Sequence, residues 1–305
     1  MTGVHTAASA GRCAIGWQLR RQLTGVAYAI PTIAFIVVLF ITPLLLVARM
    51  SGTSWPLLGR PGAINFPRNY TSIWHNRLFW PAVRFTVEYT ILATVLLIGL
   101  GLALALIVQS PSRRVSLLRT VFLVPVSLGL AAASLLAYGF FSRESGPAWP
   151  LIERLGMGDS FSFFATPLAA LLTTTFLIVW KFAGFYMLIL LVGLQGIPED
   201  VYEAGEIDGA GRWQTFRHIT LPMLLPSLSL SLILCITGSL LAFDQFFILT
   251  KGGPDNSTVT VVQLIYREAF QRQNLGTAAA LSIVVLIVLL LINAFQLRFL
   301  RRSEE

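Results

Sequence analysis

Six long apolar stretches constrain the fold of this 305-residue chain more than any other feature. A helix that crosses the hydrocarbon core of a bilayer needs about 20 apolar residues. Each stretch reaches that length, and polar segments with proline and glycine separate them. Because 55% of the residues are hydrophobic and 12% are charged, a soluble globular domain is excluded. We expect an all-α polytopic membrane protein with spans at about 25–48, 83–108, 117–141, 167–194, 223–249 and 276–299.

The segments around these spans define the expected organisation of the chain. Residues 1–24 form an N-terminal tail, residues 25–300 the membrane domain with a long loop at 195–222, and residues 301–305 a C-terminal tail. An even number of spans places both tails on one side. Lys and Arg are denser in the segments on that side, which favours the cytoplasm for both termini and for the loop. We therefore expect a multi-pass protein of a bacterial or archaeal cytoplasmic membrane, with its first span uncleaved.

Three prolines inside the apolar stretches predict local distortion of the helices. Pro31 and Pro43 stand in the first stretch and Pro125 in the third, and each removes one backbone hydrogen bond. A membrane helix tolerates this loss where neighbouring groups satisfy the freed carbonyl. We expect a kink at each proline.

Several function classes are excluded or disfavoured by the polar residues. The net charge is +8, but the basic residues are scattered near the ends of the apolar stretches, which favours membrane topology over nucleic-acid binding. The three histidines are far apart and have no metal-ligand spacing, so a membrane-embedded enzyme lacks its chemistry. No Gly-x-x-x-x-Gly-Lys-Ser/Thr pattern occurs in the sequence. We expect this chain to bind no cofactor, and the energy for any transport to come from another subunit.

The loop between the fourth and fifth stretches has the pattern of two short helices around a glycine turn. Pro198 suits a helix start, and the two acidic residues after it complement the positive helix end. Gly209 and Gly211 supply the backbone freedom for a turn. A second helix then places Trp213 and Phe216 together. Small residues beside exposed aromatic rings predict a surface that docks on another protein.

The same loop resembles the cytoplasmic signature of ABC importer permeases, which reads Glu-Ala-Ala, three residues, Gly, nine residues, Ile, one residue, Leu-Pro. At that spacing this chain has Glu203, Ala204, Gly205, Gly209, Ile219, Leu221 and Pro222. Gly205 replaces the usual second Ala, which loosens a helix by about 1 kcal/mol. The resemblance implies a coupling helix that seats in a groove of an ATP-hydrolysing subunit. The residues that we expect at this contact are Glu203, Ala204, Gly205, Asp208, Gly209, Trp213 and Phe216.

Two further segments, 193–198 and 243–254, resemble the subfamily that imports carbohydrates and glycerol phosphates. The Thr-Lys-Gly-Gly-Pro element in the second is typical of the maltose-type first permease subunit. The resemblance covers most of residues 25–300, and Arg84 departs from it, since many relatives have Asn there. It implies a type I importer permease fold, a second permease subunit, two ATP-binding subunits carrying ATP and Mg, and an extracytoplasmic solute-binding protein.

Polar side chains within the fourth stretch are candidates for a solute path, because an ionised group that faces lipid is costly. Lys181 stands beside Trp180, and together they offer a sugar hydrogen-bond donors and a ring for stacking. A structural or snorkelling lysine is an equally good interpretation. Tyr186 adds a hydroxyl on the same stretch.

Two more candidates, Asp244 and Gln245, stand near the outer end of the fifth stretch. For Asp244, pairing with a basic group is favoured over direct contact with the solute. Glu88 is a further intramembrane carboxylate, but it follows Arg84 at the i,i+4 spacing that favours a local ion pair.

The predicted function is therefore that of a permease subunit which translocates a sugar or related polyol delivered by a binding protein. Glycerol-3-phosphate or glycerophosphodiesters are an alternative solute, because the single cation Lys181 could pair with an anion but does not decide between the two classes. An ion-coupled secondary transporter is an alternative of another class. Such a transporter uses internal repeats, of which the sequence shows none, and it leaves the signature loop unexplained.

Overall fold

A computed structural model of the chain describes residues 28–60, 62–110, 112–144, 146–154, 156 and 162–302. In these ranges the chain is helical and contains no β-strand beyond two isolated bridges. Five helices are long and apolar enough to cross a membrane, and a sixth crossing results if the bent pair α5–α6 is one span. The expected all-α membrane fold is confirmed. The tail at 1–24 lies outside the described residues, and the first two residues of the tail at 301–305 belong to the last helix.

The first helix, Tyr28–Ser51, passes through Pro31 without a break. It contains a π-helical turn, η1 (Val37–Ile41), and ends with α2 (Thr42–Ser51). The backbone N–H of Thr42 donates to the carbonyl of Val37, one residue further back than in an α-helix. This widened turn directly precedes Pro43, which has no N–H to donate. The distortion expected at Pro43 therefore takes the form of a π turn.

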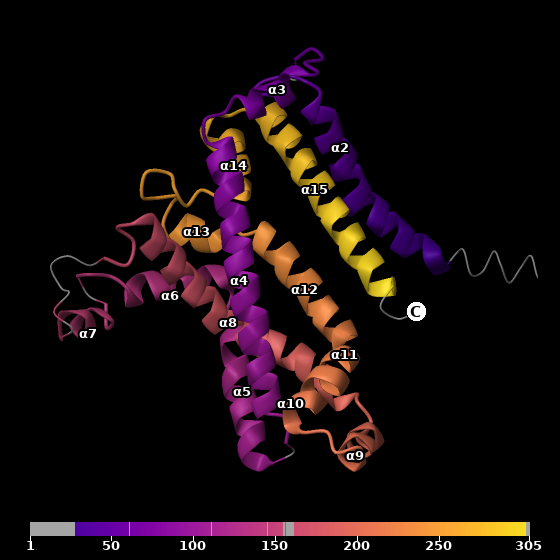
Figure 1. Ribbon diagram of the computed structural model, residues 1–305. Helices are drawn as coiled ribbons and strands as arrows, with labels where there is room; N and C mark the ends of the chain where they lie inside the picture. Colours follow the sequence, from indigo (N-terminus) through magenta and orange to yellow (C-terminus); the bar gives the residue numbers. More distant parts are fainter. Residues whose placement is uncertain are drawn as a thin grey trace, which may run out of the picture.

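A central bundle is built around α8 (Pro167–Gln195), which packs against α4 (Phe79–Ile107), α5 (Arg113–Ser127) and α12 (Leu225–Leu240). Gly184 allows α5 to cross α8 at very short range, because a Cβ at this position would collide with the carbonyl oxygen of Phe122. The final helix, α15 (Leu275–Arg302), lies beside α2 and runs antiparallel to it (Figure 1). The start of the first helix and the end of α15 therefore lie at the same end of that pair.

Two of the expected spans are interrupted. The stretch at 117–141 is not one kinked helix but two, α5 and α6 (Leu130–Phe140), whose axes differ by 96°. The break is not at Pro125 but at Leu128 and Gly129, where the backbone is extended. The stretch at 223–249 is divided into α12 and α13 (Asp244–Leu249), because the chain leaves helical geometry at residues 241–243.

One end of the molecule, which we call the cap end, is formed by residues 52–78 and 250–274 (Figure 1). It holds α3 (Arg68–Trp74), α14 (Val261–Tyr266) and the π-helical turn η3 (Arg267–Gln271). A further short helix, α7 (Trp149–Arg154), follows α6 and precedes α8 in the sequence.

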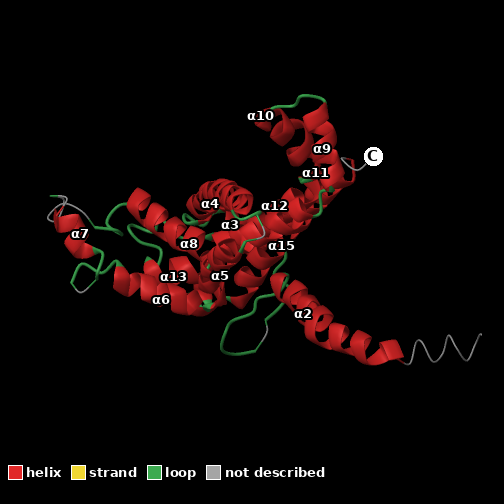
Figure 2. Ribbon diagram, turned by 90° about the horizontal axis from the view of Figure 1, so that it is seen from below, coloured by secondary structure: helices red, strands yellow, loops and turns green. Residues whose placement is uncertain are grey.

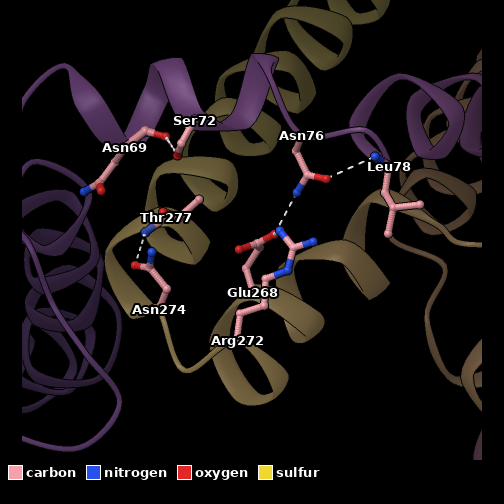
Figure 3. Close-up of polar contacts among 8 residues, drawn as sticks. All are labelled: Asn69, Ser72, Asn76, Leu78, Glu268, Arg272, Asn274 and Thr277. Carbon is pink, nitrogen blue, oxygen red and sulfur yellow. Dashed lines mark hydrogen bonds and ion pairs between the residues drawn. The ribbon is translucent and has the colours of Figure 1, made fainter.

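Buried polar side chains hold the cap end together. Glu268 is 4% exposed, and its carboxylate accepts hydrogen bonds from Asn76 and Arg272, both at 2.7 Å (Figure 3). Asn69 donates to the carbonyls of Ser51 and Thr53, both at 2.9 Å. Residues that are far apart in the sequence thus satisfy one another's polar groups at this end.

Candidate functional site

The loop at 195–222 forms the opposite end of the molecule, which we call the signature end (Figure 1). It folds into α9 (Glu199–Ile207), a turn, α10 (Arg212–Thr215), the π-helical turn η2 (Phe216–Thr220) and α11 (Leu221–Met223). Gly209 adopts a φ of +76°, which side chains other than glycine rarely allow. The predicted pair of short helices around a glycine turn is confirmed.

One narrow face of α9 packs against η2. Gly205 is buried, and a Cβ at this position would lie 2.7 Å from the Cδ1 atom of Ile219. The hydroxyl groups of Tyr202 and Thr220 are 3.3 Å apart. The glycine at the position where the signature usually has alanine therefore lets Ile219 approach the helix backbone. Ile219, a residue of the signature itself, supplies the support for α9.

The other faces of α9 and α10 are exposed, and both helices project from the bundle (Figure 2). Ile207 is 86% exposed and Trp213 is 69% exposed. The rings of Trp213 and Phe216 stack with centroids 5.7 Å apart. Sequence analysis missed Ile207, although an isoleucine between two acidic residues on an amphipathic helix was a usable signal. Exposed residues predicted for the docking surface are Glu203, Ala204, Asp208, Gly209 and Trp213.

A cavity of about 360 Å³ lies among α4, α8, α12 and α13. Three of the five residues predicted for the solute path line it: Tyr186, Asp244 and Gln245. The amide nitrogen of Gln245 donates to the hydroxyl of Tyr89 at 3.2 Å, and its amide oxygen has no hydrogen-bond partner among the described residues. The predicted residues therefore lie on two of the helices that form this cavity, α8 and α13.

Several residues that line the cavity were not predicted. They include the hydroxyl groups of Tyr89 and Ser239 and the aromatic rings of Phe185 and Phe243. Tyr89 and Ser239 are polar residues in apolar stretches, which is a weak signal because membrane helices also use such residues for packing. The mixture of hydroxyl, amide, carboxylate and ring groups suits a solute that has both polar and apolar faces.

The other two predicted residues of the solute path, Lys181 and Trp180, do not join this cavity. Lys181 is 2% exposed, and its ammonium group donates to the carbonyls of Pro125 at 3.2 Å, Val126 at 3.3 Å and Leu128. An ammonium group has three N–H donors, so all of them are used at the end of α5. Lys181 therefore stabilises the break between α5 and α6.

Trp180 points in a different direction from Lys181, because successive residues of an α-helix are rotated by about 100°. Trp180 is half-exposed and lines a separate cavity of about 430 Å³ with apolar residues of α6 and α8. Lys181 and Trp180 therefore do not share one site among the described residues, whereas the ammonium group of Lys181 lies 5.1 Å from the centroid of the Phe182 ring.

Residues 96–305 match the family described as the inner membrane component of binding-protein-dependent transport systems. The chain belongs to this family. It is a permease subunit of an ABC importer, as the signature loop predicted, and neither a membrane-embedded enzyme nor an ion-coupled transporter.

Several similar permeases are named for the carbohydrates that they transport. The sulfoquinovosyl glycerol permease SmoG of Agrobacterium fabrum is 33% identical over 262 residues, which are 85% of each chain. The multiple sugar-binding transport system permease MsmF of Streptococcus mutans is 31% identical over 88% of this chain and 92% of its own. The trehalose/maltose permease MalF of Thermococcus litoralis is 30% identical over 92% and 94%.

A solved structure shows the same permease fold. A chain of a bacterial ABC transporter that imports the acidic polysaccharide alginate superposes with a TM-score of 0.83 and 22% identity. The superposition covers 95% of this permease and 99% of that chain. Multi-pass insertion in the inner membrane follows from the family and from the apolar helices.

Proposed function

We propose that this permease passes an uncharged carbohydrate or related polyol across the membrane as one of two permease subunits of an ATP-driven importer. The cavity lined by Tyr186, Asp244 and Gln245 carries the solute assignment. A sugar presents hydroxyl groups and apolar C–H faces, which match the polar groups and the rings of this cavity. The names of MsmF and MalF support the same class of solute.

The signature end couples this permease to ATP hydrolysis in our proposal. Two ATP-binding subunits hold ATP and Mg, while this chain binds neither. Closure of those subunits moves α9 and α10, and the helical bundle then rocks against the second permease subunit. The exposed apolar side chains Ile207 and Trp213 support the assignment, because a projecting apolar surface is typical of a protein contact. The residues proposed for the contact are Glu203, Ala204, Asp208, Gly209, Trp213 and Phe216, with Gly205 behind them.

The orientation that we propose places the signature end and both termini in the cytoplasm. The cap end then faces outward and receives the extracytoplasmic solute-binding protein, while lipid surrounds the apolar helices. The density of Lys and Arg in the inner segments supports this orientation.

An anionic solute such as glycerol-3-phosphate is not favoured. That alternative depended on Lys181, and the ammonium group of Lys181 is engaged by backbone carbonyls of α5 and Leu128. The cavity itself contains the carboxylate of Asp244, which disfavours an anion.

The test is uptake by proteoliposomes that contain this permease with the second permease and ATP-binding subunits, supplied with the binding protein. We expect uptake of a labelled oligosaccharide or polyol that requires internal ATP, and a changed uptake in Gln245→Ala, which alters the cavity. Transport by this chain without the ATP-binding subunits, or uptake of glycerol-3-phosphate in preference to sugars, would contradict the proposal.

A further inference from the structure

An exposed ion pair lies on α4 near the cap end. The Nε atom of Arg84 is 2.7 Å from the Oε1 atom of Glu88, and the two side chains are 82% and 49% exposed. Trp80 precedes Arg84 by one turn, is exposed, and contacts Trp74 with ring centroids 5.5 Å apart. Tryptophan side chains favour the headgroup region of a bilayer. With a helical rise of about 1.5 Å per residue, Arg84 and Glu88 lie about 6 Å and about 12 Å deeper.

Glu88 is therefore at the depth of the hydrocarbon core, where contact of an ionised side chain with lipid is costly, and Arg84 is at the edge of that core. The next exposed residues on the same face of α4 are apolar: Ile91 is 61% exposed and Val95 is 65% exposed. The polar zone is thus limited to the turns nearest the cap end. This part of the face needs water or a polar ligand rather than lipid.

The ion pair lines a groove of about 360 Å³. Its other walls are Phe85, the beginning of α8 and Ser257 of the cap end. The solute cavity uses later turns of the same two helices, with Tyr89 on α4 and Tyr186 on α8. The groove and the cavity therefore follow one another along α4 and α8, and the groove lies nearer the cap end.

A layer of aromatic rings separates the two spaces. The ring of Phe246 contacts Phe85 at 5.0 Å and Tyr89 at 4.8 Å between centroids, both edge to face. Phe85 lines the groove and Tyr89 lines the cavity. A solute that moves along α4 from the groove to the cavity crosses this layer.

We infer that the Arg84–Glu88 groove is an outer binding subsite for a polyhydroxyl solute, occupied before the solute crosses the ring layer. The inference rests on the proposed function. Only the Nε atom of Arg84 is engaged by Glu88, and its terminal nitrogens have no hydrogen-bond partner among the described residues. A guanidinium group beside a carboxylate offers donors and acceptors together, which matches adjacent sugar hydroxyl groups. The pair has no net charge, so it does not select an anion.

Accessibility of an introduced thiol tests the subsite in the complete transporter. In Glu88→Cys we expect labelling by a membrane-impermeant thiol reagent and protection by binding protein loaded with carbohydrate. The matched control is Ile91→Cys on the same face, which should stay unlabelled because it faces lipid. An unreactive Glu88→Cys would overturn the subsite. Equal protection by unloaded binding protein would also overturn it, because protection would then report docking of that protein.

Uptake by charge-neutral variants provides the second measurement. At saturating loaded binding protein, we expect Arg84→Gln and Glu88→Gln to lower the solute imported per ATP hydrolysed by at least about threefold, as loss of a charge-assisted hydrogen bond predicts. Arg77→Gln, at an exposed arginine outside the groove, should leave it unchanged. Unchanged ratios would overturn the subsite, and so would loss of the second permease subunit on purification, which would make the pair a subunit contact. If the wild-type transporter moves no carbohydrate, the proposed function itself fails.

Discussion

The cap end and the signature end of this permease differ in how many of their side chains find partners within the chain. At the cap end, Glu268, Asn76 and Arg272 come from distant parts of the sequence and satisfy one another (Figure 3). At the signature end, α9 packs through one narrow face, and Ile207 and Trp213 are left exposed. The buried polar groups of the first end are satisfied within this chain, although Leu58, Ile64 and Phe66 are exposed there. At the second end, we propose that a partner covers the exposed side chains. Substitutions should therefore impair folding at the cap end and coupling at the signature end.

The largest expected effect is on stability, from Glu268→Ala at the cap end. The substitution removes the acceptor of Asn76 and Arg272. We expect the free energy of unfolding to fall by about 3 kcal/mol, since hydrogen bonds to a buried charge are lost together. Thermal unfolding of the purified complex in detergent measures this. Glu144→Ala, at an exposed position, is the control, and equal stability of the two variants would contradict the self-sufficiency of the cap end.

Between the two ends, Lys181→Met tests whether the lysine belongs to the fold or to the solute path. Methionine keeps most of the length of the side chain but removes the donors to Pro125, Val126 and Leu128. We expect a loss of stability of about 2 kcal/mol. Lys251→Met, at an exposed position, should have no such effect. A variant with unchanged stability and changed solute selectivity would instead show that Lys181 belongs to the solute path.

At the signature end, Glu203→Lys reverses an exposed charge at the proposed contact with the ATP-binding subunit. We expect ATP-driven uptake to fall about tenfold, which corresponds to about 1.4 kcal/mol of coupling, without loss of thermal stability. Gly209→Trp should also lower uptake, because it adds bulk to the exposed turn, but a side chain at a φ of +76° should in addition cost about 1 kcal/mol of stability. Uptake and thermal unfolding, measured on the same variants, distinguish a loss of coupling at the signature end from a loss of stability at the cap end. The charge reversal Glu144→Lys, away from the loop, should transport normally.

The sequence predicted those features that depend on a local pattern. Apolar length predicted the long helices, and the glycines with the spacing of the signature predicted α9, the turn and α10. The break between α5 and α6 was not predictable from Pro125, because it depends on Lys181 of another helix, which satisfies the carbonyls that the break frees. The lining of the cavity that we propose for the solute was predicted in part. Asp244 and Gln245 were visible as polar residues, whereas the direction of Lys181 depends on how α5 crosses α8 at Gly184.

The smallest expected effect comes from Gly205→Ala, which introduces the usual residue of the signature. Alanine stabilises a helix by about 1 kcal/mol relative to glycine, but its Cβ would lie 2.7 Å from the Cδ1 atom of Ile219. The terminal methyl group of Ile219 can rotate away, so we expect the two effects nearly to cancel and uptake to stay normal. Ile219→Val removes that methyl group.

The double variant Gly205→Ala with Ile219→Val should therefore recover more of the helix propensity than Gly205→Ala does alone. Hydrogen exchange of the α9 amides measures this, because a gain of about 1 kcal/mol slows exchange about fivefold where local opening governs it. A non-additive result in the four-variant cycle would show that the stability of α9 depends on the contact between residues 205 and 219. Additive effects would mean that α9 is held independently of Ile219. The packing of α9 would then not distinguish the signature end from the cap end, and only its exposed side chains would.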